Sequence, residues 1–518
     1  MAAAVNARNG MVASAHELSS SCGVNILSKG GNVVDAAIAT SAALCVVQNN
    51  SCGLGGDTFA ILKLGGKIME INGSGRAAKA ATIDFYEGKG RSSIPQRGPL
   101  SCITVPGLVH AWGELLKYAT MDLSELIAPA IAYAEDGVSL NAKYVESIKA
   151  SADSLGSCEG WRELFLPDGK VPEVGSVLKQ KDLANSLRMI ANEGTQTFYK
   201  GELAEKIVRG VKEEGGLIYS EDLENHTSNW KKPLSTIYRG VKIYETSPNS
   251  QAATVLLWLN MLENYDLGRV SNKQDSLQEI LVATCLKVYE ERAKYIGDPS
   301  FFPLPPEFIS KKFAEQVSGV PPTARSGMQS ETIGDTTYFA VGDREGNTVS
   351  MIQSNYNGFG SGVMPKGTGL VLHNRGSYFS LDRSHHNSLA PGKRTFHTLC
   401  ASIGEQDDVT LFALGTMGGD IQPQVHVQLL TKILDFNAEL QEAIDAPRWI
   451  IPGTIYERPS TIFYEKGLKP SRSVPKQLKV MQFEGLSSLA GHAQAVYFSN
   501  EGLSGAADPR CGGAAKGF

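Results

Sequence analysis

The sequence predicts an α+β fold in which helices and sheets are stacked in layers. Short strands with alternating apolar residues recur along the chain, and segments with the helical period lie between them. Several strands come as pairs around tight turns, such as residues 235–238 and 241–244 on either side of Arg239-Gly240. Because hairpins with helices before and after them must cover their apolar faces, stacked layers are expected.

The expected elements follow from these periods. Strands are expected at residues 10–15, 59–62, 67–71, 235–238, 241–244, 336–341, 348–352, 410–414 and 493–498. Helices are expected at residues 18–27, 33–47, 108–118, 123–135, 180–193, 201–214, 251–265 and 278–293, and from residue 425 onward. Asn32 is placed to cap the alanine-rich helix at 33–47.

Composition is that of an ordinary soluble globular protein. The chain has 518 residues, 20% charged and 42% hydrophobic, with a net charge of -5. Neither a nucleic acid nor a membrane is expected as a partner, because there is no basic run. The most apolar stretch, residues 33–47, is too short to span a bilayer, and the N-terminus lacks the order of a secretory signal.

The eight cysteines are scattered and form no C-x-x-C motif. This usage is typical of free thiols in a reducing compartment, so we expect a cytoplasmic protein. We expect no metal and no cofactor. The pair His385-His386 lies in a polar segment, where solvated rings that point apart are the more common arrangement.

A turn cluster separates two strands near the middle of the chain, and the first strand begins at Asp335-Thr336. The segment before it, residues 318–332, is polar and contains two prolines and two glycines, as a processing loop would. Thr336 has two interpretations. It is an ordinary strand threonine, or the chain is cut before it and the new amino group serves as the base for its hydroxyl.

A glycine-rich loop at residues 53–57 has two possible uses. Such loops can cradle a phosphate, but this one matches neither the P-loop nor the dinucleotide fingerprint. Close packing against a neighbouring backbone is the favoured interpretation.

In these features the sequence resembles the gamma-glutamyltransferase family of N-terminal-nucleophile (Ntn) hydrolases. No single motif decides this, but their order and spacing together are specific. The resembling segments are residues 10–14, 30–37, 54–56, 105–107, 260–263, 335–337, 343, 346–347, 391–394, 418–419 and 505–510.

The resemblance implies a four-layer αββα sandwich that cuts itself between Asp335 and Thr336. Residues 1–335 would form the large subunit and residues 336–518 the small one, together a single intertwined domain. Thr336 would be the nucleophile, and Ser354 occupies the position of a second, supporting hydroxyl. Gly418 and Gly419 correspond to the two glycines whose N–H groups form the oxyanion site.

The substrate pocket departs from the family pattern. The family's arginine for the donor α-carboxylate falls on Ser74, with Arg76 two residues later. The glutamine and the aspartate that hold the α-amine fall on Arg375 and Tyr378. Since a buried ammonium without a carboxylate partner costs several kcal/mol, this pocket suits an anion better than an ammonium.

Three further substrate-binding positions also differ. The family's asparagine falls on Tyr356, and its serine pair falls on His397 and Thr398. His397 could contact the substrate or a backbone carbonyl. Arg375 and Arg76 could bind a substrate carboxylate, or could pair with structural carboxylates such as Asp382 or Asp420.

This pattern is similar to the branch of the family that includes oxamate amidohydrolases and cephalosporin-acylase-like proteins. It implies hydrolysis of a small carboxylate-bearing amide through a threonine acyl-enzyme. The alternatives are a true gamma-glutamyltransferase or glutathione hydrolase, and an inactive relative that does not process itself. The expected partners are the amide substrate and the two fragments of the chain, and the oligomeric state stays open, with a homodimer as one alternative.

Overall fold

Two seven-stranded sheets lie face to face in a computed structural model that describes residues 3–270, 274–318, 335–457, 459–472 and 474–518. In order across the first sheet, the strands are β1 (Val5–Ala7), β18 (Gly502–Ala507), β17 (Ala493–Ser499), β13 (Val409–Thr416), β12 (Ala401–Gln406), β9 (Val241–Glu245) and β8 (Leu234–Tyr238). The second sheet runs β19 (Ala514–Gly517), β2 (Gly10–Ser14), β10 (Asp335–Asp343), β11 (Thr348–Tyr356), β3 (Asp57–Leu64), β4 (Lys67–Gly73) and β7 (Asn229–Lys231).

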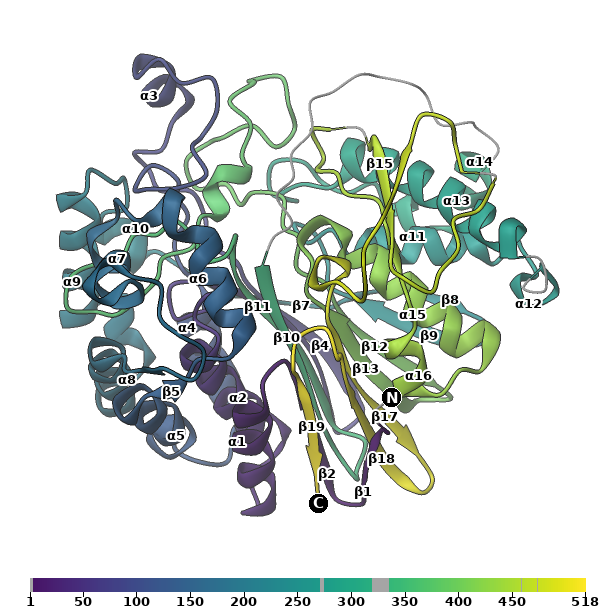
Figure 1. Cartoon of the computed structure of the whole chain (residues 1–518), viewed down its shortest axis with the longest axis horizontal. Coiled ribbons are helices and arrows are strands. Elements are labelled where there is room, and N and C mark those ends of the chain that lie inside the picture. The colour runs from purple at the N-terminus through teal and green to yellow at the C-terminus, as the bar shows by residue number, and fades with distance from the viewer. Residues whose placement is uncertain (1–2, 271–273, 319–334, 458, 473) are drawn as a thin grey trace.

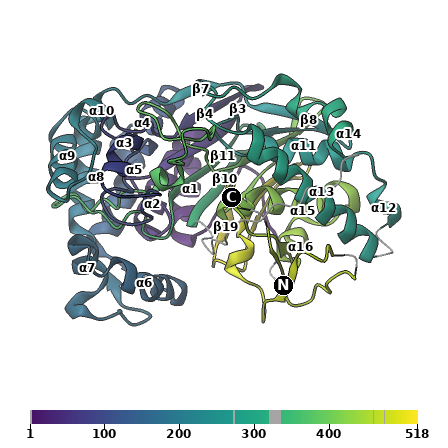
Figure 2. The same cartoon turned by 90° about the horizontal axis from the view of Figure 1, so that it is seen from above.

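Helices cover the outer face of each sheet (Figure 1). Those before β7 are α1 (Glu17–Ser28), α2 (Val33–Val47), α3 (Ile83–Gly88), α4 (Leu108–Leu115), α5 (Leu123–Asp136), α6 (Ala142–Leu155), α7 (Glu159–Phe165), α8 (Lys181–Glu193), α9 (Glu202–Glu213) and α10 (Ser220–Glu224). Those after β9 are α11 (Ala253–Leu262), α12 (Leu267–Val270), α13 (Gln274–Tyr295), α14 (Lys311–Ser318), α15 (Gln422–Phe436) and α16 (Leu440–Asp445). Figure 2 shows α6 and α7 projecting to one side of the sandwich.

Successive side chains of a strand lie in different parts of the core. In β10, Tyr338 and Ala340 lie in the core between the two sheets, whereas Phe339 and Val341 pack beneath the helices of the second sheet. In β13 of the first sheet, Ala413 faces the core between the sheets, and Leu414 faces the opposite helices. Since successive side chains of a strand point to opposite faces, both sheets are buried on both sides. The result is the expected αββα sandwich.

Helix α2 shows how the sequence sets a boundary. The Asn32 side chain accepts hydrogen bonds from the N–H groups of Val34 and Asp35, and Asp35 accepts one from Asn32 N–H. This capping box satisfies the free donors of the first turn. All fifteen residues of α2 are buried, which its run of small residues allows.

Strands from residues before and after position 335 alternate in both sheets. In the second sheet, β10 and β11 lie between β2 and β3, and in the first sheet β18, β17, β13 and β12 lie between β1 and β9. The two predicted subunits therefore share both sheets and could not separate without exposing strand edges.

Most predicted elements are present, with ends that shift by a few residues. The pairing of β3 with β4, β8 with β9 and β10 with β11 is antiparallel, as the hairpin turns indicate. Several elements have no counterpart among the predictions: α6, α7, β12, β18, β19, the two-stranded pair β5 (Val138–Ser139) and β6 (Val177–Leu178), and the small sheet of β14 (Trp449–Ile450), β15 (Thr461–Tyr464) and β16 (Lys479–Gln482). The predicted processing loop lies almost entirely outside the described residues.

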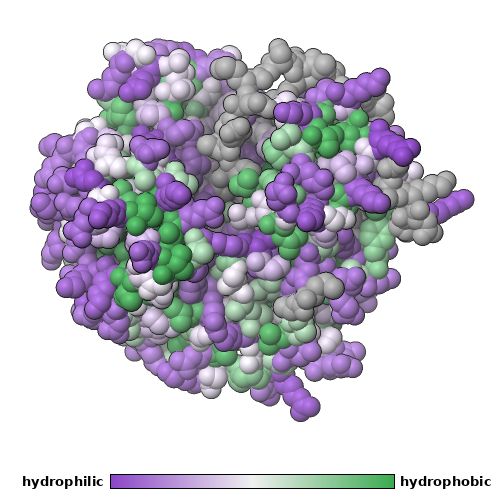
Figure 3. All heavy atoms as spheres, viewed as in Figure 1, coloured by the Kyte–Doolittle hydropathy of each residue, from purple (hydrophilic) through white to green (hydrophobic). Residues whose placement is uncertain are grey.

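The surface is largely hydrophilic on the face drawn in Figure 3, with apolar groups in small scattered areas. Within the described parts of the chain, no helix is both long and apolar enough to cross a membrane.

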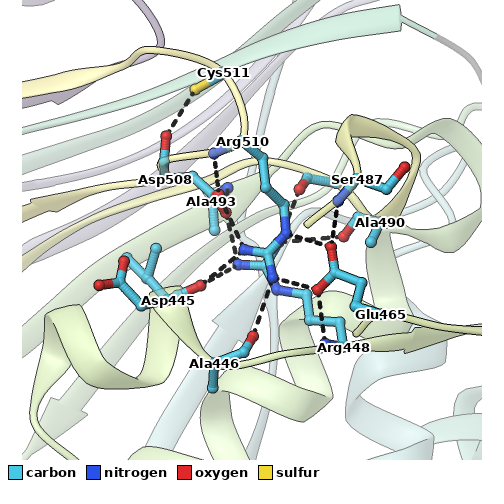
Figure 4. A network of polar contacts seen from close by, with 12 residues as sticks. Asp445, Ala446, Arg448, Glu465, Ser487, Ala490, Ala493, Asp508, Arg510 and Cys511 are labelled. Carbon is cyan, nitrogen blue, oxygen red and sulfur yellow. Dashed lines mark hydrogen bonds and ion pairs between the residues drawn. The ribbon is translucent and has the colours of Figure 1, made fainter. Parts of the chain in front are cut away.

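A buried ion-pair network ties the end of the chain to the first sheet's helical layer (Figure 4). Arg448 donates to Asp508 at 2.7 Å, and Arg510 donates to Asp508 at 3.0 Å and to Glu465. Although burial alone raises it, the two guanidinium groups bring the pKa of Asp508 below its usual value. Asp508 therefore holds two arginines that have no access to water.

We expect Asp508→Asn to lower the free energy of unfolding by about 3–5 kcal/mol, because it leaves Arg448 and Arg510 buried without their shared carboxylate. Chemical denaturation measures this, with the exposed Asp382→Asn as the matched control. The native pKa of Asp508 is lowered, so its contribution should be complete above its unfolded pKa and lost as the pH falls through its native pKa. A loss equal to that of the control would contradict this role.

Candidate active site

Thr336 and Ser354 meet at the paired ends of β10 and β11. Thr336 Oγ1 lies 3.0 Å from Ser354 Oγ, and both side chains are buried. The register of the two strands shifts between Asp335 and Thr337, so a bulge lies at Thr336. A bulge redirects a side chain out of the regular ladder, and here it brings the two hydroxyls together.

The two hydroxyls form a chain of hydrogen bonds that ends at the Asp335 carbonyl. Ser354 Oγ donates to the Asp335 carbonyl oxygen at 2.8 Å and accepts from Tyr356 N–H at 2.8 Å. Because the Ser354 proton is committed to that carbonyl, Thr336 donates its own proton to Ser354. The carbonyl of the Asp335–Thr336 bond is thus polarised beside the hydroxyl predicted to attack it.

The Asp335 carboxyl also lies at the predicted cleavage site. Its Oδ1 accepts from Thr336 N–H at 3.0 Å, and its Oδ2 lies 3.5 Å from the Asn50 amide nitrogen. Burial raises the pKa of Asp335. This acid therefore holds the Thr336 N–H at the predicted cut.

We expect Ser354→Ala to slow both self-cleavage and amide hydrolysis by about tenfold or more, since one hydrogen bond to a reacting group is lost. Ser354→Thr keeps the hydroxyl and should retain most of both rates. Denaturing gels over a time course report the cleavage rate, and an amidase assay reports the hydrolysis. An alanine variant that cleaves as fast as wild type would exclude this role for Ser354.

The glycine-rich loop before β3 packs directly against the site. A Cβ on Gly55 would lie 2.3 Å from the Val371 carbonyl oxygen, and one on Gly56 would lie 2.6 Å from the Ser354 carbonyl oxygen. The prediction of close packing is confirmed, and the packed backbone includes that of Ser354.

Gly418 and Gly419 lie between β13 and α15. Their φ angles are +133° and +56°, in the left-handed region that favours glycine. A Cβ on Gly418 would also lie 2.8 Å from Ile421 Cδ1. Gln251 fixes this turn, because its Nε2 donates to both the Gly419 and Thr398 carbonyls at 2.9 Å. No local pattern in the sequence pointed to Gln251 as a site residue.

Arg375 is a buried guanidinium without a carboxylate partner among the described residues. Its side chain is 1% exposed, and Nη1 donates to Thr398 Oγ1 at 3.1 Å. Its Cζ lies 4.1 Å from the centre of the Tyr356 ring. Nε and Nη2 have no hydrogen-bond partner in the described structure. Burial lowers the pKa of Arg375 although the nearby carboxylates Asp57 and Asp420 oppose this, so the charged form is only partly compensated here.

Asp420 is a carboxylate near Arg375 that already has two partners. Tyr378 donates its hydroxyl to Asp420 Oδ1 at 2.6 Å, and Arg292 forms an ion pair with the same carboxylate at 3.3 Å. Asp382 is exposed and accepts from Ser384. Neither carboxylate forms a salt bridge with Arg375 in the described structure, so the alternative that Arg375 pairs with Asp382 or Asp420 is wrong.

His397 pairs with a carboxylate, a partner that was not considered from the sequence. Its Nε2 donates to Asp57 Oδ2 at 3.0 Å, and its Nδ1 accepts from Leu399 N–H at 3.4 Å. Burial, with the nearby Arg375, lowers the pKa of His397 to about 3, so this ring is neutral. Although burial alone raises it, His373 and His397 bring the pKa of Asp57 to about 2. Asp57 is thus a buried anion that orients His397 and faces Arg375.

Arg76 lies apart from this cluster. Its guanidinium donates to the Thr227 carbonyl and hydroxyl at 3.3 and 3.4 Å, and to Asn229 Oδ1 at 3.4 Å. It lines a separate cavity, described below. The pair of histidines also differs from expectation, because the His385 and His386 rings stack at 4.4 Å instead of pointing apart.

The predicted residues form one continuous path of contacts. It runs from Thr336 to Ser354, through Tyr356 to Arg375, then to Thr398 and, through Gln251, to Gly419. A predicted nucleophile, a buried cation and a glycine turn are thus brought together. Such a set can attack a carbonyl, hold an anion beside it and stabilise an oxyanion.

Comparison with known proteins places this arrangement in a family. The sequence model of the family described as gamma-glutamyltranspeptidase matches residues 19–518. The chain belongs to the gamma-glutamyltranspeptidase family. It is 39% identical to the glutathione hydrolase-like YwrD proenzyme of Bacillus subtilis (strain 168), with 98% of each chain covered. It is 33% identical to the oxamate amidohydrolase proenzyme of Klebsiella pneumoniae, again with 98% of each covered.

A solved structure shares the whole fold. The cephalosporin acylase of Bacillus halodurans superposes with a TM-score of 0.91 at 34% identity, covering 100% of this chain and 97% of the acylase. This chain is an autoprocessing Ntn amidohydrolase, because it belongs to the gamma-glutamyltranspeptidase family and its relatives are proenzymes. Its processing yields large and small subunits of the same chain.

Proposed function

We propose that this enzyme hydrolyses a small amide that carries a carboxylate, through an acyl-enzyme on Thr336. The observation that supports this most directly is Arg375, whose buried guanidinium has two unpartnered nitrogens and packs on Tyr356, the residue that donates its N–H to Ser354. A buried charge of this kind needs an anion, and a guanidinium binds a carboxylate through two parallel hydrogen bonds. The substrate would supply the partner that the protein does not.

Maturation begins with attack of Thr336 Oγ1 on the Asp335 carbonyl carbon. Ser354 donates to the carbonyl oxygen, and the Thr336 hydroxyl proton passes to the leaving nitrogen as the Asp335–Thr336 C–N bond breaks and an ester forms. Water then hydrolyses this ester, which leaves Asp335 as a carboxylate and Thr336 with a free hydroxyl and α-amine. Since an α-amine has a pKa near about 8, a useful fraction is neutral at working pH and can accept a proton.

Catalysis repeats the same chemistry on the substrate amide. Thr336 Oγ1 gives its proton to the α-amine and bonds to the amide carbon, while the oxyanion accepts hydrogen bonds from the N–H groups of Gly418 and Gly419. The proton taken up by the Thr336 α-amine then passes to the leaving nitrogen of the substrate as the C–N bond of the amide breaks. Water hydrolyses the acyl ester with the α-amine as base, and an acid is released.

The residues around Arg375 disfavour an ammonium. Tyr378 stands where the family's aspartate is expected, and the one carboxylate it contacts, Asp420, is already paired with Arg292. A substrate α-ammonium would therefore face Arg375 without a free carboxylate. This is why we favour a simple carboxylate-bearing amide over a γ-glutamyl amide.

A γ-glutamyl amide is the second candidate, since one relative is named glutathione hydrolase-like. The name of another relative, oxamate amidohydrolase, provides a test substrate of the favoured class. We expect a kcat/KM for oxamate at least about tenfold above that for γ-glutamyl-p-nitroanilide, because only the latter brings an ammonium beside Arg375. Faster turnover of the γ-glutamyl substrate, abolished by Thr336→Ala, would overturn this preference.

We propose a cytoplasmic location, supported by eight free cysteines, seven of them buried. Cell fractionation tests it, and recovery from the medium or a membrane fraction would contradict it. A homodimer stays a prediction that light scattering of the processed enzyme tests directly.

A further inference from the structure

A cavity that is separate from the site at Arg375 lies beside Arg76. It has a volume of about 230 Å³ and is lined by Arg76, Asn229, Trp230, Lys231, Asn249, Asp298, Pro299, Ser300 and Arg394. Three of these residues are cations and one is an acid. The cavity is large enough for a small organic ion with a few waters.

The three cations are positioned by neutral oxygens. Arg394 donates to the Ser74 carbonyl at 2.9 Å and to the Thr227 carbonyl at 3.0 Å, and Arg76 shares that Thr227 carbonyl. Lys231 donates to the Pro248 carbonyl at 3.0 Å. Among the described residues, none of the three forms a salt bridge with a carboxylate. Their positions are therefore fixed while their charges stay available.

The acid in the cavity offsets only part of this charge. The two oxygens of Asp298 accept from the backbone N–H groups of Arg394 at 2.7 Å and Ser300 at 3.0 Å. Burial and the neighbouring Arg76 lower the pKa of Arg394 to about 10, and burial lowers that of Lys231. The nearby carboxylates Asp57 and Glu70 are engaged by His397 and by Ser247. Three positive charges thus surround a space with one acid on its wall.

We propose that this cavity is a second anion-binding site, which takes a small organic carboxylate between Arg76, Lys231 and Arg394. It is distinct from the site at Arg375, because its lining includes neither Arg375 nor Thr398. Asn249 lines the cavity, its side chain donates to the Thr395 carbonyl, and its own carbonyl accepts from His397 N–H at 2.8 Å. The site does not depend on the proposed reaction, because none of its cations contacts Thr336 or Arg375.

Calorimetric titration of the processed enzyme at fixed ionic strength tests this, with malonate as the anion and malonamide as its neutral analogue. We expect malonate to bind and malonamide not to bind. Arg76→Gln and Lys231→Met should each weaken malonate binding by about tenfold or more, since each removes a charged donor. Lys232→Met, one residue away and exposed, should leave it unchanged.

Arg375→Met distinguishes the two sites. We expect it to leave malonate binding at the second cavity intact, still sensitive to Lys231→Met. The proposal is overturned if wild type does not bind malonate, or if Arg375→Met abolishes binding. It is also overturned if Lys231→Met and Lys232→Met behave alike, a comparison that needs no change at Arg375.

Discussion

Thr336→Ala should yield a single uncleaved chain without amidase activity. The hydroxyl is both the attacking group in self-cleavage and the nucleophile of the proposed reaction, so kcat should fall by about 10⁴-fold or more. Wild type should give two fragments, residues 1–335 and 336–518, which remain associated. A denaturing gel and a native sizing column report the two properties.

Thr337→Ala is the matched control for this change. Thr337 is the adjacent threonine of β10, and its hydroxyl donates to Gln48 Oε1 at 2.9 Å, away from Ser354. We expect this variant to cleave and to retain most of its activity. Thr336→Ser keeps a hydroxyl and should cleave more slowly than wild type. Normal processing of Thr336→Ala would refute the assignment.

Arg375→Met should lower kcat/KM for oxamate by at least about 10²-fold. The substrate carboxylate would lose its buried partner, a change that costs about 3–5 kcal/mol for a buried pair. Arg375→Lys should recover little, because an ammonium cannot reproduce the two parallel donors of a guanidinium. Ethyl oxamate, which has no carboxylate, should lose much less in the same variant.

Self-cleavage separates this prediction from a loss of folding. Arg375 does not contact the Asp335–Thr336 bond, so Arg375→Met should still give two fragments. The surface arginine Arg383, which pairs with Asp84 and Glu87, provides the control variant Arg383→Met, and its activity should equal that of wild type. An equal loss for oxamate and ethyl oxamate would show that Arg375 does not bind the carboxylate.

Local patterns in the sequence were enough to predict the elements that hold the site. Asn32 ends a turn and starts α2, and the turn after Asp343 joins β10 to β11, because caps and hairpin turns depend on adjacent residues. The missed strands β12, β18 and β19 are rich in alanine, glycine and serine. Such residues carry little strand preference, and these strands form because neighbouring strands offer hydrogen bonds.

The surroundings of the site depend on contacts between distant residues, which no local pattern reveals. Asp57 was visible only as the end of a glycine-rich loop, yet it is the partner of His397. Arg375 and Asp420 suggested an ion pair, but Arg292 of α13 takes that carboxylate. Arg76, two residues after Ser74, points into another cavity because Thr227 and Asn229 hold it there. Long-range pairing thus decided which polar groups are satisfied and which remain available.

The central claim is that Thr336 becomes an N-terminal nucleophile that carries the acyl group. Mass spectrometry of the processed enzyme, quenched during turnover of an amide substrate, tests it most directly. We predict a small subunit that begins at Thr336 and a mass increase of one acyl group on its first peptide, absent from an unreacted sample. A cut at another bond, or an acyl group on a different residue, would contradict the account.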